Sequence, residues 1–211
     1  MDNRQIAFQK ASKGLIENLK KRGMEGFFYE DHASCAKAIL SMIPEGSTVS
    51  WGGSASVAEC GILDALQAGK YELIDRTAAK TEEEQREIYA KTVLADYYFM
   101  STNAITYDGQ LVNIDGNGNR VACLIHGPKH VFLIVGMNKL TSTIEGAFER
   151  ARTMACPPNA VRLNKQTPCG LTGKCQDCLA PDCFCNQIVV TRRSGHPGRI
   201  KVFLVAEDLG F

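Results

Sequence analysis

Five cysteines lie close together in the last quarter of the sequence, in the pattern Cys169-x5-Cys175-x2-Cys178-x4-Cys183-x-Cys185. Glycine and proline residues between them permit the chain to bend sharply. Four thiolates can bind one metal centre, and a Cys-x2-Cys pair places two ligands on a single turn. We therefore predict a metal site formed by the first three of these cysteines together with either the fourth or the fifth.

The spacing indicates metal binding but leaves the kind of metal open. It matches neither the two separated Cys-x2-Cys pairs of a zinc ribbon nor the run of cysteines in bacterial ferredoxins, so zinc and an iron–sulfur cluster are both compatible with it. The alternative is a set of free or disulfide-bonded cysteines. We favour metal because nine cysteines is an odd number and because residues 1–20 lack the apolar stretch of a secretory signal, which predicts a reducing, cytoplasmic location.

A glycine turn provides a second candidate site. The predicted strand Thr48–Trp51 runs into Gly52, Gly53 and Ser54, and a predicted helix follows over 57–67. Glycines let the backbone approach a ligand, and the amides at a helix start suit a carboxylate or phosphate. Glu59 would then be placed to act as an acid or base. The alternatives are a tight turn capped by Ser54, and a glutamate that only complements the helix dipole.

Polar residues also gather where later strands are predicted to end. They occupy the runs 101–104 and 113–120, and the side chains that suit a ligand are Asn103, Asn113, Asp115, Asn117 and Arg120. If these runs converge on the glycine turn, they form a pocket for a small anion. Asn117 and Gly118 fit an ordinary hairpin turn equally well.

Helical and strand patterns alternate along most of the chain, which predicts an α/β protein with a mostly parallel sheet covered on both faces. The predicted helices are Arg4–Lys20, Ala33–Met42, Val57–Gln67, Glu82–Ala95 and Thr141–Met154. The predicted strands are Phe27–Tyr29, Thr48–Trp51, Tyr71–Ile74, Tyr97–Met100, Leu111–Ile114, Ala122–Ile125, Val131–Val135, Ile188–Thr191 and Ile200–Val205. Short strands that follow one another after Tyr107 predict an antiparallel portion.

Composition excludes several classes of function. Lys and Arg number 24 against 23 Asp and Glu, a net charge of +1, so nucleic acid is not the expected partner. No apolar run reaches the ~20 residues needed to cross a bilayer, so no membrane segment is expected. We expect one domain over residues 1–211, with the cysteine segment 169–185 inserted before the last strands, and self-association into a homo-oligomer is left open.

The chain also resembles a known family. The matching runs are Gly52-Gly53-Ser54 with Glu59, 101–106, 113–122, Gly136-Met137-Asn138-Lys139, and Thr172-Gly173-Lys174-Cys175 with Cys178 and Cys185-Asn186. Over almost its whole length the sequence resembles the lactate-utilisation (LUD) domain proteins, and among them the lactate utilisation protein C group. The resemblance implies a NagB/RpiA/CoA-transferase-like fold, a three-layer α/β/α sandwich. It also favours Cys185 over Cys183 as the fourth ligand, because related sequences often carry a different residue at position 183.

Three functions follow from these observations. The resemblance implies a component of L-lactate or related 2-hydroxy-acid oxidation that works beside iron–sulfur partner subunits and binds a small anionic molecule. The first alternative is a stand-alone enzyme of the isomerase, ligase, acyl-transferase or CoA-transferase type, with Glu59 as acid, base or nucleophile and Arg120 as anion clamp. The second is a non-catalytic binding protein stabilised by metal. In each case we expect the metal loop to lie apart from the ligand pocket at Gly52 and Gly53.

Overall fold

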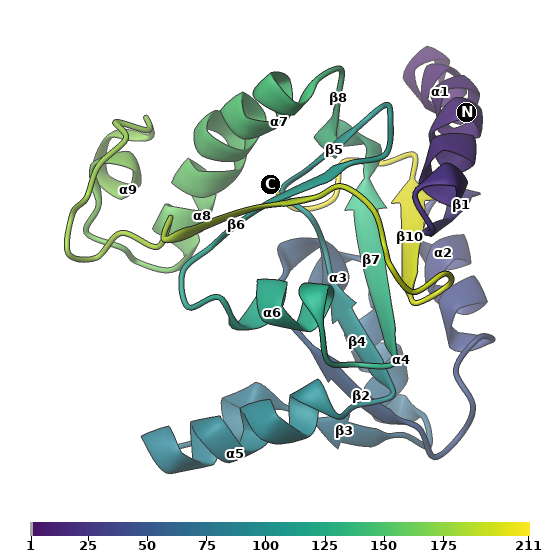
Figure 1. The fold of residues 1–211 in the computed structure, drawn as a ribbon, viewed down its shortest axis with the longest axis horizontal. Helices are drawn as coiled ribbons and strands as arrows, with labels where there is room; N and C mark the ends of the chain where they lie inside the picture. The colour runs from purple at the N-terminus through teal and green to yellow at the C-terminus, as the bar shows by residue number, and fades with distance from the viewer. Residues whose placement is uncertain (1) are drawn as a thin grey trace.

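The computed structural model describes residues 2–211 and is built on a six-stranded sheet whose neighbouring strands are all parallel. The order across the sheet is β1 (Glu25–Tyr29), β10 (Ile200–Val205), β7 (His130–Gly136), β4 (Tyr97–Met100), β2 (Thr48–Trp51) and β3 (Glu72–Ile74). The apolar run from Val131 to Val135 is fully buried in β7, near the middle of the sheet (Figure 1). Burial on both faces is what its lack of polar alternation predicted.

Helices cover both faces of this sheet. They are α1 (Asn3–Lys21), α2 (His32–Leu40), α3 (Ala55–Glu59), α4 (Ile62–Ala68), α5 (Glu82–Val93) and α6 (Asn119–Ile125). Buried residues of α2, α3 and α4 pack against one face, around Phe99 and Phe132. Buried residues of α1 and α6 pack against the other face, around Met100 and Leu133. The three-layer α/β/α sandwich predicted from the sequence is therefore confirmed.

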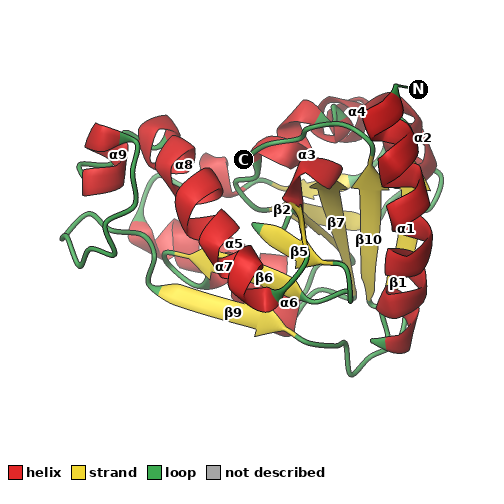
Figure 2. Cartoon of the chain, turned by 90° about the horizontal axis from the view of Figure 1, so that it is seen from above, coloured by secondary structure: helices red, strands yellow, loops and turns green. Residues whose placement is uncertain are grey.

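A second, smaller sheet carries the predicted antiparallel portion. Its order is β8 (Leu140–Thr141), β5 (Ala104–Thr106), β6 (Leu111–Asp115) and β9 (Gln187–Thr191). Strand β6 pairs antiparallel with β5 and with β9, whereas β5 and β8 are parallel. Figure 2 shows β9 along the outer side of β6. The two closing strands predicted at 188–191 and 200–205 thus belong to different sheets.

The remaining helices follow β8. They are α7 (Ile144–Arg150), the π-helical turn η3 (Ala151–Ala155), α8 (Cys156–Arg162) and α9 (Pro168–Thr172), and short 3-10 turns occur at η1 (Arg76–Ala78) and η2 (Met137–Lys139). The predicted helix 141–154 therefore begins three residues late, at Ile144 behind the cap Thr143, and its last residues form the π-helical turn that continues into α8.

Two other predicted elements are wrong. The expected strand Ala122–Ile125 is the second half of α6, which begins at Asn119 after the cap residue Gly118, in the left-handed region with φ 81°. Its run of apolar residues is too short for the sequence alone to distinguish a buried turn of helix from a strand. The expected helix 57–67 is divided into α3 and α4 by Gly61, whose φ of 73° interrupts the helical path.

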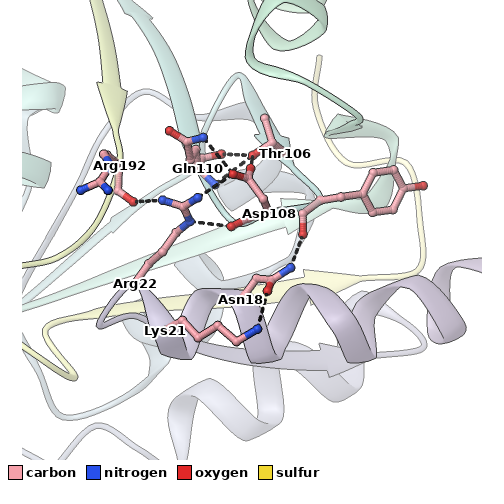
Figure 3. Close-up of polar contacts among 8 residues, drawn as sticks. Asn18, Lys21, Arg22, Thr106, Asp108, Gln110 and Arg192 are labelled. Atoms are coloured by element: carbon pink, nitrogen blue, oxygen red, sulfur yellow. Dashed lines mark hydrogen bonds and ion pairs between the residues drawn. The ribbon is translucent and has the colours of Figure 1, made fainter.

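Polar contacts fix α1 to the second sheet. At the C-terminal end of α1, the Arg22 guanidinium donates to the Asp108 carboxylate and backbone oxygens and to the Arg192 carbonyl (Figure 3). Asn18 donates from the same helix to the Tyr107 carbonyl at 3.1 Å. These bonds hold the β5–β6 turn in place, and with it the strand β6 that leads to the candidate site. None of the helices within residues 2–211 has the length and apolar character needed to span a membrane.

Candidate functional site

A pocket of about 550 Å³ opens where three neighbouring strands of the main sheet end. Its floor comes from the segments that follow β2, β4 and β7, including Gly53, Ser101 and Lys139. The carboxyl ends of parallel strands lie at one edge of a sheet, which is where ligands of such folds bind. The end of α8 and the segment 181–186 supply the other walls.

The structure brings most of the predicted ligand-binding residues together at this pocket. Those that line it are Gly53, Ser54, Asn103, Asp115, Asn117 and Arg120. Gly52 lies behind the lining, where a Cβ atom would come within 3.0 Å of the Tyr98 hydroxyl and 3.3 Å of Arg120 Cδ. Glycine at this position thus gives space to the arginine. Asn113 is fully buried and also lies behind the lining, where its Oδ1 accepts a hydrogen bond from Arg120 at 2.7 Å.

Arg120 organises the polar floor of the pocket. Its guanidinium donates to the Ser101 carbonyl at 3.0 Å and to the Ile114 carbonyl at 2.8 Å. It also contacts Asn103 Oδ1 at 3.4 Å, and its Nε lies 3.3 Å from Asp115 Oδ2. A guanidinium carries five N–H donors, and with Asn113 the two terminal nitrogens of Arg120 make four hydrogen bonds to protein acceptors. This geometry joins the ends of β4 and β6, while the predicted use of Arg120 as an anion clamp stays a prediction.

Lys139 is a pocket residue that our sequence analysis did not select. Its side chain is 3% exposed, and its Nζ lies 2.7 Å from Ser56 Oγ and 3.1 Å from Ser101 Oγ. Burial, and then the positive charges of Arg150 and Arg120, lower the pKa of Lys139 to about 7. A signal was present in the sequence, because a lysine three residues beyond the most apolar strand is placed at the carboxyl edge of the sheet.

The pocket has more positive than negative charge. Its cationic side chains are Arg76, Arg120, Lys139, Arg162 and Lys165, and its acidic ones are Asp115 and Asp182. Both acids are paired, Asp115 with Arg120 and Asp182 with Lys165, at 3.3 and 2.6 Å. Among the residues that the structure describes, the other three cations have no carboxylate within salt-bridge distance. The site is therefore electrostatically suited to an anion.

Glu59, the predicted acid or base, lies outside the pocket lining on the exposed side of α3. Its carboxylate accepts a hydrogen bond from the backbone amide of Gly210 at 2.6 Å. Ser56 of the same helix donates to the Leu209 carbonyl at 3.0 Å. These contacts hold residues 209–211 against α3, with Phe211 reaching the pocket. A catalytic role for Glu59 stays a prediction.

The cysteine segment places several thiols near one another, while the predicted set of four ligands stays a prediction. The Cys185 Sγ lies 3.6 Å from the Sγ of Cys156, a buried cysteine that the predicted set did not include. The backbone amide of Cys185 donates a hydrogen bond to the Cys183 Sγ at 3.4 Å. The hydrogen bond with Cys156, followed by burial, raises the pKa of Cys185. Cys169 is buried beside Thr167 in α9, 3.3 Å from its hydroxyl. Over residues 2–211, no group of three or more His, Cys, Asp or Glu is arranged to hold a metal ion.

The segment is also closer to the ligand pocket than we expected. Pro181, Asp182, Cys183, Phe184 and Asn186 all line the pocket, so the loop forms one of its walls. The expected separation between the cysteine loop and the pocket is therefore wrong. The physical reason is that β9, which follows the loop, pairs with β6, whose last residues line the pocket, and this pairing brings the loop to the same edge. No local pattern in the sequence indicates that pairing.

Comparison with known proteins places this geometry in a family. Among solved structures, the fold is similar to a DUF162 family protein from Deinococcus radiodurans, with a TM-score of 0.56, 11% identity, and coverage of 94% of this chain and 98% of that chain. Weaker similarities are to eIF2B delta from Chaetomium thermophilum (TM-score 0.37, 17% identity, 57% of this chain and 54% of that chain) and to ribose 5-phosphate isomerase A from Methanocaldococcus jannaschii (TM-score 0.34, 15% identity, 54% and 55%). No curated protein matches the sequence. The family model of the LUD domain matches residues 12–205, and the chain therefore belongs to the LUD domain family.

Proposed function

We propose that this protein takes part in the oxidation of L-lactate or a related 2-hydroxy acid and binds the carboxylate of that acid in the pocket at the ends of β2, β4 and β7. One observation carries the proposal. The pocket contains three cations, Arg76, Lys139 and Arg162, whose charge no carboxylate of the described residues neutralises. Membership of the LUD domain family supports a 2-hydroxy acid as the source of the anion.

The pocket is large enough to hold a second molecule beside the acid. A volume of about 550 Å³ falls in the range of pockets that hold drug-sized ligands, so a three-carbon acid leaves room for a second molecule. Oxidation of the acid to its 2-oxo product releases two electrons and two protons. We propose that iron–sulfur partner subunits, as the family resemblance implies, accept the electrons one at a time, and that the protons pass to water.

Calorimetric titration with L-lactate, pyruvate and acetate tests the binding step. We expect saturable binding of L-lactate and pyruvate to the wild-type chain, and weaker binding to Arg162→Gln, because Arg162 lies at the pocket wall beside the Gly53 carbonyl. Arg86→Gln is the matched control, since Arg86 is an exposed arginine on α5 away from the pocket. The proposal is contradicted if neither L-lactate nor pyruvate binds. It is also contradicted if Arg162→Gln and Arg86→Gln bind these two acids with equal affinity.

We propose further that the cysteine segment binds metal through Cys169, Cys175, Cys178 and Cys185, as zinc or as an iron–sulfur cluster. An iron–sulfur cluster would carry single electrons, whereas zinc would only hold the loop together. All but the first of these cysteines lie in the irregular stretch 173–186. Gathering them around Cys169 therefore rearranges a loop without breaking a helix or a strand.

Metal and sulfide analysis of protein purified without oxygen tests this second proposal, together with an absorption spectrum. Iron with sulfide and a visible chromophore supports the cluster, zinc without a chromophore supports a structural role, and the absence of both contradicts the metal site. Replacing Cys183 and Cys185 one at a time with serine identifies the fourth ligand. We expect Cys185→Ser to lose metal and Cys183→Ser to keep it.

A further inference from the structure

Lys139 is held in an unusual position for a lysine. It follows the buried strand β7, and its amino group is fixed by the hydroxyls of Ser56 from α3 and Ser101 from the end of β4, at 2.7 and 3.1 Å. An ammonium group has three N–H donors. In the part of the chain that the structure describes, the third donor has no acceptor, and Lys139 lines the pocket.

The charges around Lys139 do not neutralise it. Arg120 on α6 and Arg150 on α7 add positive charge on two sides. Glu59 on α3 is the acid that acts on Lys139, but its carboxylate is bound to the Gly210 amide. Gly210 also lies near the amino group, since a Cβ atom there would come 3.4 Å from Nζ, and the side that faces the pocket stays open. A buried charge without a counter-ion is costly, and an anion in the pocket would remove that cost.

We propose that Lys139 receives the carboxylate of the bound 2-hydroxy or 2-oxo acid through its third N–H, and that the protein takes up a proton when this carboxylate binds. The inference rests on the proposed function, and it adds the group that contacts the anion. Ser56 and Ser101 position the ammonium. The positive charges of Arg120 and Arg150 lower the pKa of Lys139, so the amine loses its proton readily when no anion is bound.

The sign of the pH dependence follows from this arrangement. In the free protein the pKa of Lys139 is about 7, and a carboxylate beside the ammonium raises it. Below pH 7 the site is already charged, so affinity is highest and binding takes up little proton. Above pH 7 the amine must be protonated for the anion to bind, so affinity falls by up to about tenfold per pH unit until the pKa of the complex is reached.

Calorimetry in two buffers of different ionisation enthalpy measures this proton uptake directly. At about pH 8 we expect wild type to take up close to one proton per bound pyruvate. The dissociation constant for pyruvate should rise steadily from about pH 6.5 to about pH 8.5, a range that spans the pKa of Lys139. Lys139→Gln should bind at least about tenfold more weakly at pH 6.5, without proton uptake. Lys91→Gln, which removes an exposed lysine on α5, should behave as wild type.

The outcomes separate this inference from the proposed function. Pyruvate or L-lactate binding that Lys139→Gln leaves unchanged overturns the role of Lys139 but not the carboxylate pocket. Binding of inorganic phosphate that Lys139→Gln weakens, and of neither acid, overturns the 2-hydroxy-acid proposal and the assignment of a carboxylate to Lys139, while leaving an anion site there. If the Lys139 variants do not fold, ¹³C NMR of wild type labelled at lysine Cε decides: a Lys139 pKa that saturating pyruvate does not raise overturns the inference.

Discussion

Replacing Arg120 with methionine removes the guanidinium that joins the ends of β4 and β6 beneath the pocket. Methionine is close to arginine in length and fills much of the same space, so the change tests the polar contacts more than the packing. The variant leaves the Asp115 carboxylate, which is 8% exposed, without its cation. It also removes the donors to the Ser101 and Ile114 carbonyls and to the Asn113 side chain.

The magnitude follows from the burial of these groups. Breaking a buried ion pair by removing one partner costs about 3–5 kcal/mol, because an uncompensated charge remains behind. Carbonyls left without donors would add about 1 kcal/mol each if no water reached them. Arg120 lies at a pocket surface, with its side chain 17% exposed, so water replaces part of what is lost. We therefore expect a loss near the lower end of that range, about 3 kcal/mol in the free energy of unfolding.

Urea unfolding followed by circular dichroism measures this loss, with Arg86→Met on α5 as the matched control at about 0.5 kcal/mol or less. Adding Asp115→Asn to Arg120→Met should recover about 1 kcal/mol or more, because the amide carries no charge that needs a partner. A cost below about 1 kcal/mol for Arg120→Met would refute the reasoning. So would a double variant whose loss equals the sum of the two single losses.

Three further predictions concern stability elsewhere in the fold. Phe132→Ala should cost about 3–5 kcal/mol in urea unfolding, because Phe132 is fully buried in β7; Leu94→Ala, at a residue 79% exposed, is the control, and similar losses would contradict the assigned core. The hydrogen bond from Lys129, together with those from Thr48, lowers the pKa of Asp96 from 3.8 to about 2, so its stabilising effect is present above about pH 4 and is lost as the pH falls towards 2. Asp96→Asn should therefore lose about 1–2 kcal/mol at pH 7 and much less at pH 2, where about half of the carboxyl is protonated, and a loss that is equal at both pH values would exclude this cause. Thr81→Ala should lower the free energy of unfolding, measured in urea, by about 1 kcal/mol, because Thr81 caps α5. No loss would show that the cap is not formed in solution.

Local patterns in the sequence were sufficient for much of the main sheet. The uninterrupted apolar run of β7 predicted a strand buried on both faces, because such a run has no polar side to turn towards water. The glycine turn after β2 and the polar run 101–104 after β4 were placed correctly at strand ends. In an all-parallel sheet those ends share one edge, so this part of the candidate pocket followed from the element order. Asp115 and Arg120 follow β6 of the second sheet, and only the tertiary structure brings them to the same pocket.

Other features depended on contacts between distant residues, which no local pattern encodes. Lys139 acquires its properties only from Ser56, Ser101 and the arginines that the fold places around it. Residues 122–125 became helical because a short apolar run takes the conformation that its surroundings bury best. The pairing of β9 with β6 moved the cysteine loop to the pocket wall. The sequence by itself thus determined which residues could do chemistry, and the tertiary structure decided which of them meet, because burial and charge at a site are set by neighbours from elsewhere in the chain.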